Sequence, residues 1–197
     1  LSSNPVGLPE RSTVLAEAQN LVSTFNNLGE SLFQIQRNLD ATIQVETQKI
    51  NSLTSEIAEL NQAIHANEPV AFSANDLRER RDQRVKELSE LIDLNYVDEM
   101  DGQISLTLNN GTPLVLQSTA FSMSTQLNGN NKGFQDIVVA GLNGTSTNVT
   151  SIVSGGSLKG LIDMRDTEVA GVKDKLDRLA AGFIQEFNNV RSEERRV

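Results

Sequence analysis

The fold is decided by one stretch, residues 14–64, which reads VLAEAQNLVSTFNNLGESLFQIQRNLDATIQVETQKINSLTSEIAELNQAI. Its apolar side chains recur in steps of three and four residues, and this spacing places them on one face of an α-helix. Glu46 interrupts the row, and two successive steps of four at Ile35, Leu39 and Ile43 mark a slip in its register. At about 1.5 Å per residue one such helix would reach roughly 75 Å, which predicts a rod rather than a compact ball.

We expect this apolar row to be a seam against which other helices pack. A second row with similar spacing runs through residues 158–190, so the sequence predicts a return helix that lies against the first. Residues 75–93 form a shorter amphipathic helix that a capping box at Ser73 opens, and Ser157 is expected to cap the return helix. The predicted seam residues are Val14, Ala18, Leu21, Phe25, Leu28, Leu32, Ile35, Leu39, Ile43, Ile50, Leu53, Ile57, Leu60 and Ile64 on the first helix, with Leu176, Leu179 and Phe183 on the return helix.

Between these helices the apolar period changes from helical to two. The dipeptides Asp101-Gly102 and Asn110-Gly111 are strong signals for two-residue hairpin turns, and they separate runs in which apolar and polar residues alternate. The predicted strands lie near residues 95–100, 103–109 and 113–117, with weaker strands in a polar, loop-like segment near residues 120–127, 135–140 and 148–153.

These elements predict an α+β protein that is mainly α. The expected architecture is an elongated antiparallel bundle of long helices with a small antiparallel β module inserted into it. The rod is discontinuous, comprising residues 1–93 and 156–190, and the β-rich outer module comprises residues 94–155. We expect residues 191–197 to be a tail left by a truncation or a cloning scar. The start at Leu1 suggests an excised fragment.

The composition excludes several classes of protein. A formal net charge of −9 argues against a general nucleic-acid binder, because nothing here would neutralise a run of phosphates. The chain has no cysteine, so it has no disulfide, no thiolate zinc site and no cysteine nucleophile. No apolar run is long enough to span a bilayer, and the first residues do not resemble a secretory signal peptide. Aromatic residues make up only 4%, which predicts a core of aliphatic side chains.

The residues that could carry chemistry are scattered. His65 is the only histidine, and no partners lie at metal-ligand spacing in the sequence, so an exposed structural role is expected. The carboxylates at 98–101 and 163–166 are expected to belong to a turn and to a solvated helix face. The sequence therefore predicts no catalytic, cofactor-binding or metal-binding residues. The seams themselves allow two interpretations: they pack within the chain, or part of a seam stays open for a neighbouring subunit.

Several motifs, in the same order, resemble the flagellar hook-associated protein 1 (FlgK) family. The first is the stretch NDLRERRD at residues 75–82, in which Asn75, Leu77, Arg81 and Asp82 match the family pattern. The others are Ile50-Asn51, IAELNQAI at residues 57–64, the turns Asp101-Gly102 and Asn110-Gly111 with Leu114-Val115, GGSLKGLIDMR at residues 155–165, and Leu179 with Phe183 and Phe187-Asn188. The resemblance covers nearly the whole chain.

This resemblance implies a structural subunit of the bacterial flagellum, needed for assembly at the joint between hook and filament, without catalysis or cofactors. Family members have a long-helix domain like domain D1 of flagellin and are exported by the flagellar type III apparatus to an extracellular position. The implied partners are the hook protein, the second hook–filament junction protein and further copies of the chain, with no nucleic acid and no membrane. The family's terminal helices are missing here, so the fragment alone is expected to be monomeric. The rival hypothesis is a secreted coiled-coil stalk whose β tip acts as an adhesin or binds a ligand.

Overall fold

The computed structural model describes residues 8–67, 74–141 and 144–194. The chain divides into two compact units. The helical unit comprises Leu1–Gln36 and Arg165–Val197, and the mixed unit comprises Arg37–Met164. Both boundaries fall inside helical segments, so this division differs from the expected one between a helical rod and a β module.

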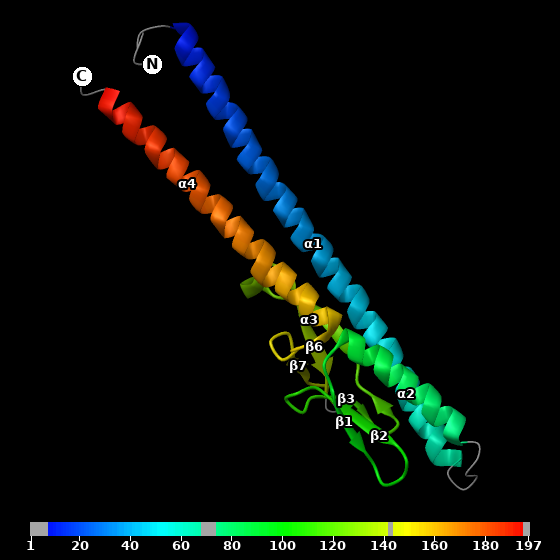
Figure 1. The fold of residues 1–197 in the computed structure, drawn as a ribbon. Coiled ribbons are helices and arrows are strands. Elements are labelled where there is room, and N and C mark those ends of the chain that lie inside the picture. Colours follow the sequence, from blue (N-terminus) through cyan, green and yellow to red (C-terminus); the bar gives the residue numbers. More distant parts are fainter. Residues whose placement is uncertain (1–7, 68–73, 142–143, 195–197) are drawn as a thin grey trace. The chain divides into compact units, whose positions relative to one another are not determined.

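The structure is mainly helical with two small antiparallel sheets, as the sequence predicted (Figure 1). The long first helix is confirmed as α1, Leu8–Asn67, and Asn67 Nδ2 donates a hydrogen bond to the Ala63 carbonyl in its last turn. The other elements are α2 (Ala74–Leu91), β1 (Asn95–Asp98), β2 (Ile104–Thr107), β3 (Pro113–Leu116), β4 (Thr119–Ala120), β5 (Met123–Leu127), η1 (Gly129–Asn131), β6 (Gln135–Ala140), β7 (Ser146–Asn148), α3 (Gly156–Asp163), a π-helical segment η2 (Met164–Glu168) and α4 (Val169–Glu194). The predicted capping residue Ser73 lies outside the described residues.

The β region of the mixed unit forms two sheets. One has the strand order β1-β2-β3-β4 and the other the order β5-β6-β7, and every pairing is antiparallel. Both predicted hairpins are present, but each loop has three residues rather than two, since Glu99 bonds to Gln103 and Leu108 to Thr112. Gly102 and Gly111 end these loops with positive φ angles of 76° and 83°, which only glycine adopts without strain. The segment that the sequence described as loop-like contains the second sheet, and Asp136 through Val139 of β6 are buried.

The core of the mixed unit lies between α1 and the two sheets. Ile43, Ile50, Ile57 and Ile64 repeat every seven residues along α1 and are fully buried. Ile43, Ile50 and Ile57 pack in one cluster with apolar residues of α2, α3 and the strands, among them Leu88, Leu158, Ile104, Leu106, Leu114, Ile137 and Val139. Burial of each such side chain contributes about 1.5–3 kcal/mol, so this aliphatic core dominates the stability of the unit.

The seam in the helical unit differs from the prediction at two positions, each by one residue. On α1 the buried or half-buried positions are Val14, Ala18, Leu21, Phe25, Gly29, Leu32 and Gln36. Leu28 and Ile35, which were predicted in the seam, are 48% and 46% exposed. The steps follow an eleven-residue pattern, which matches a nearly straight helix better than seven-residue steps do. The prediction was wrong here because Gly29 and Gln36 have no apolar side chain to mark the seam.

The return helix is interrupted. α3 begins at Gly156 after an N-cap at Gly155 that makes no side-chain capping bond, so Ser157 is not the cap. Figure 1 shows α4 running antiparallel to the first half of α1 within the helical unit, and the Lys173 Nζ lies 5.9 Å from the centroid of the Phe33 ring. Of the predicted seam residues of α4, Leu176 is half-buried, whereas Leu179 and Phe183 are exposed. The helix continues to Glu194, so the start of the predicted tail is helical.

Gly156 allows the return helix to start against the end of α2. Its φ is +78°, and a Cβ at this position would lie 2.4 Å from the carbonyl carbon and oxygen of Leu91. Both the backbone conformation and the close approach therefore require glycine.

We expect Gly156→Ala to lower the free energy of unfolding by about 1–3 kcal/mol or more, because it adds backbone strain and a clash with backbone atoms that cannot move aside. The matched control is Gly160→Ala in the same helix, where a Cβ meets no atom within 4 Å. That substitution should stabilise by about 0.5–1 kcal/mol. Urea unfolding followed by circular dichroism measures the stability of both variants. Equal changes in the two would contradict the special requirement for glycine at position 156.

Candidate functional site

Arg81 is the one residue of the NDLRERRD motif that lies in the interior of the mixed unit. It projects from α2 and is only 5% exposed. Its Nη1 donates hydrogen bonds to the carbonyl of Gly102 at 2.8 Å and to Oδ1 of Asn61 at 3.2 Å, and its Nε lies 3.7 Å from Oδ1 of Asp82. A buried guanidinium is costly unless it is paired in this way. Arg81 therefore joins α2 to the turn between β1 and β2.

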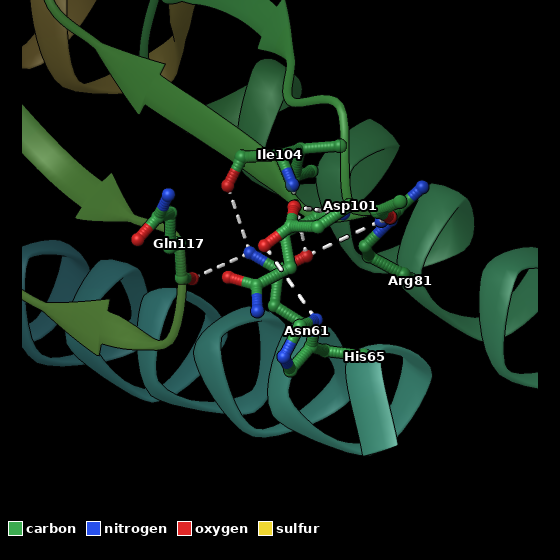
Figure 2. A network of polar contacts seen from close by, with 8 residues as sticks. Asn61, His65, Arg81, Asp101, Ile104 and Gln117 are labelled. Atoms are coloured by element: carbon green, nitrogen blue, oxygen red, sulfur yellow. Dashed lines mark hydrogen bonds and ion pairs between the residues drawn. The ribbon is translucent and has the colours of Figure 1, made fainter. Parts of the chain in front are cut away.

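Asn61 is the centre of this network, which we call the Asn61–Arg81 network (Figure 2). The side chain is fully buried on α1. Its Nδ2 donates to the carbonyl of Ile104 at 2.8 Å and to that of Gln117 at 2.6 Å, while its Oδ1 accepts from the Ile104 amide at 3.2 Å and from Arg81. One amide group thus connects α1, α2 and the first sheet, and uses its donors and its acceptor to do so.

Asn51 holds the second sheet in the same manner. Its Nδ2 donates to the Met123 carbonyl and its Oδ1 accepts from the Met123 amide, both at 2.7 Å. Eleven residues earlier along α1, Oδ1 of Asp40 accepts a hydrogen bond from the Gln135 amide at 3.1 Å. Polar side chains of α1 thus supply the hydrogen bonds that a neighbouring strand would otherwise provide, so the sheets are positioned by specific contacts as well as by apolar packing.

The other motif residues lie outside the network. Asn75 is exposed and accepts a hydrogen bond from Nη1 of Arg78, Leu77 is half-buried, and Asp82 is exposed. Asn51 and Asn61 belong to the family-like patterns of the sequence, but the patterns alone indicated no role for them. A polar amide at or beside a position where a helix seam expects an apolar residue is the signal that could have identified them.

His65 is exposed, as the sequence predicted, but it has a neighbour that the sequence did not reveal. Its Nδ1 lies 3.5 Å from Oδ2 of Asp101 in the turn between β1 and β2. Within the described residues no group of three or more histidine, cysteine, aspartate or glutamate side chains is arranged to hold a metal ion. No described helix combines the length and the apolar character that crossing a bilayer requires.

The helical unit presents an uncovered apolar face. On α4, Val172, Leu179 and Phe183 follow one another at intervals of seven and four residues, so they share one side of the helix, and all three are exposed. Leu28 and Ile35 on α1 are similarly exposed. A groove of about 450 Å³ lies between the two helices, and its lining is Thr13, Val14, Glu17, Ala18, Leu21, Phe183 and Phe187. Exposed apolar side chains that share one side of a helix are typical of an interaction surface.

Asp93 joins three segments of the mixed unit. Its Oδ2 accepts hydrogen bonds from Nδ2 of Asn109 at 3.0 Å and from Oγ of Ser154 at 2.9 Å. These hydrogen bonds stabilise the charged form of the Asp93 carboxyl and so hold its pKa below its ordinary value. The hydrogen bond from Asn109 has the larger effect.

Comparisons with known proteins agree on one family. The family model for the helical domain of the flagellar hook-associated protein FlgK matches residues 1–195. Flagellar hook-associated protein 1 of Bacillus subtilis is 29% identical over 212 residues, which is 96% of this chain and 42% of that protein. The Escherichia coli protein of the same name is 26% identical over 193 residues, which is 95% of this chain and 35% of that protein. This chain therefore spans well under half the length of these relatives.

A solved structure has a similar fold. The flagellar hook junction protein FlgK from Burkholderia pseudomallei superimposes with a TM-score of 0.75 and 28% sequence identity. The match covers 83% of this chain and 30% of that one.

Asn61→Leu tests the Asn61–Arg81 network. The substitution keeps the side chain's size but removes the acceptor of the Ile104 amide and leaves Arg81 with the Gly102 carbonyl as its remaining buried acceptor, so we expect the free energy of unfolding to fall by about 2–4 kcal/mol. Hydrogen exchange at the Ile104 amide should also become faster in this variant. Gln62→Leu, at the exposed neighbouring position, is the control and should change both quantities little. Unchanged exchange at Ile104 in Asn61→Leu would refute the assignment.

Asn109→Ala tests the environment of Asp93. The pKa of Asp93 is lower in the folded than in the unfolded chain. The charged carboxylate therefore stabilises the fold at pH values above the unfolded pKa, and this contribution is lost as the pH falls through the folded pKa. The variant should raise the pKa of Asp93 towards 3.8, which NMR titration of the carboxyl group measures. The stability difference from the parent chain should be constant well above the unfolded pKa and should shrink as the pH falls below it, through the lowered folded pKa. Asn130→Ala, at an exposed position away from Asp93, should leave the titration unchanged.

Proposed function

Since the chain belongs to the family of the flagellar hook-associated protein FlgK, we propose that it is part of a structural subunit that joins the hook of the bacterial flagellum to the filament. In this proposal the subunit has no catalytic role. It leaves the cell through the flagellar type III apparatus and acts at an extracellular position in the flagellum. Its partners are the hook protein, the second hook–filament junction protein and further copies of itself. The names of the matched relatives support this assignment.

The proposed mechanism is mechanical. The aliphatic seams of the helices of residues 1–93 and 156–190 carry load, and the β module of residues 94–155 supplies surface for contacts. The Asn61–Arg81 network and Asn51 support this mechanism, because they hold both sheets on α1 through directional hydrogen bonds. Fixed contacts of this kind resist deformation better than apolar packing alone, which tolerates sliding.

The observation that carries the proposal is the exposed apolar face of the helical unit. Val172 and Leu179 on α4 are about half or more exposed, and Leu28 and Ile35 on α1 flank the same seam. Full burial of such a side chain contributes about 1.5–3 kcal/mol, and a partner helix would recover about half of that for each side chain that is half exposed. A subunit of an assembly has a reason to retain such a face, whereas a free-standing protein would cover it or replace it with polar residues.

Leu179→Ser in the full-length protein tests this surface. Leu179 is 65% exposed, and loss of its contact with a partner should weaken binding to purified hooks about tenfold or more, because about 1.4 kcal/mol corresponds to a factor of ten. Co-sedimentation of the protein with hooks measures the binding.

Ile184→Ser is the matched control, since Ile184 is 60% exposed on a different side of the same helix. It should bind hooks nearly as the parent protein does. Both variants should keep the parent's circular dichroism melting curve, which separates a lost contact from a lost fold. Equal losses of binding in the two variants, or a parent protein that does not bind hooks, would contradict the proposal.

A further inference from the structure

Each of the two facing seams contains one buried polar position, and the two positions meet. Gln36 occupies the seam position of α1 that follows Leu32, and it is only 3% exposed. Arg165 occupies the seam position that precedes Val169 on the return helix, and it is 0% exposed. Nε2 of Gln36 donates a hydrogen bond of 2.8 Å to the carbonyl oxygen of Arg165. Both residues belong to the helical unit.

The acceptor lies in the π-helical segment Met164–Glu168. A π turn inserts an extra residue into the regular helical ladder and displaces its carbonyl groups, so a side chain from another helix can reach one of them. The guanidinium of Arg165 is held by its neighbour Asp166, with Nε to Oδ1 at 2.7 Å and Nη2 to Oδ2 at 2.8 Å. These contacts fix the turn that presents the carbonyl to Gln36.

We propose that Gln36 sets the axial register of α4 against α1 in the helical unit. The rest of this seam is largely apolar and repeats in steps of three and four residues, so sliding by one helical turn exchanges one apolar contact for another. The Gln36 amide does not tolerate such a slip, because one turn away it would be buried without an acceptor. A single polar residue in an apolar seam determines helix register in this way, at some expense of stability.

Spin-label distances test the proposal on the full 197-residue chain. The chain has no cysteine, so cysteines introduced at Asn27 on α1 and Glu186 on α4, both exposed, carry the only labels. The parent chain should give one narrow distance distribution. In Gln36→Leu we expect a broadened distribution or a second population from helices displaced by about one turn, roughly 5.4 Å along the axis. The helical circular dichroism signal should be retained and the melting temperature should be unchanged or raised, because an apolar side chain fills the seam.

Two further variants make the outcome decisive. Gln19→Leu makes the same chemical change at an exposed position of α1 and should keep the single narrow distribution. Gln36→Met, close in size and without the amide, should behave like Gln36→Leu even where the leucine variant folds poorly. A single unshifted distribution in both Gln36 variants would overturn the proposal. Unfolding of both would also overturn it, because a residue that only determines register is not required for folding.

Discussion

The structure depends on one constraint: the side-chain amides that α1 buries must find partners. The buried face of this helix is aliphatic over most of its length. The hydroxyls of Thr47 and Thr54 interrupt it but bond to the backbone of the helix itself. The amides of Asn61 and Gln36 also interrupt it, and Asn51 lies beside it. A buried amide without a partner would cost about 1–3 kcal/mol, so each one restricts what can pack at that point. Asn51 and Asn61 each select a particular strand backbone, and Gln36 selects a particular carbonyl. Apolar burial provides the stability, and these amides determine which arrangement is stable.

Arg81 on α2 and Gly156 on α3 are likewise explained by what packs against them. The Arg81 guanidinium can be buried only because Gly102 and Asn61 offer oxygen atoms to it. Gly156 lets the backbone of the return helix approach Leu91 more closely than any side chain would permit. Both residues lie in the family-like motifs of the sequence, and neither has a chemical task. An arginine and a glycine are needed at these positions because of how α1, α2 and α3 meet at the core of the mixed unit.

What the sequence could predict was local. The period of the apolar residues identified α1 and the return helix, and the Asp101-Gly102 and Asn110-Gly111 turns placed the first sheet, because these signals depend on neighbouring residues alone. The register around Gly29 and Gln36 could not be found in this way. Which positions are covered there depends on the partner helix, and the burial of Gln36 depends on a carbonyl far away in the sequence. The buried role of Arg81 was hidden for the same reason, since on α2 alone it is one of several arginines.

The two units differ in how completely they bury their apolar residues, and geometry explains the difference. In the mixed unit, two sheets and further helices surround the seam of α1. In the helical unit, the apolar side chains of α1 from Leu15 to Ile35 span an arc of roughly 160° at about 100° per residue. A single neighbouring helix covers only the middle of such an arc, so Leu15, Val22, Leu28 and Ile35 remain at its two edges. A pair of helices cannot enclose a core of its own, and burying more of this one requires at least one further element. The apolar arc is therefore wider than α4 can cover. The exposed apolar surface that a partner would bury thus lies in this unit rather than in the mixed one.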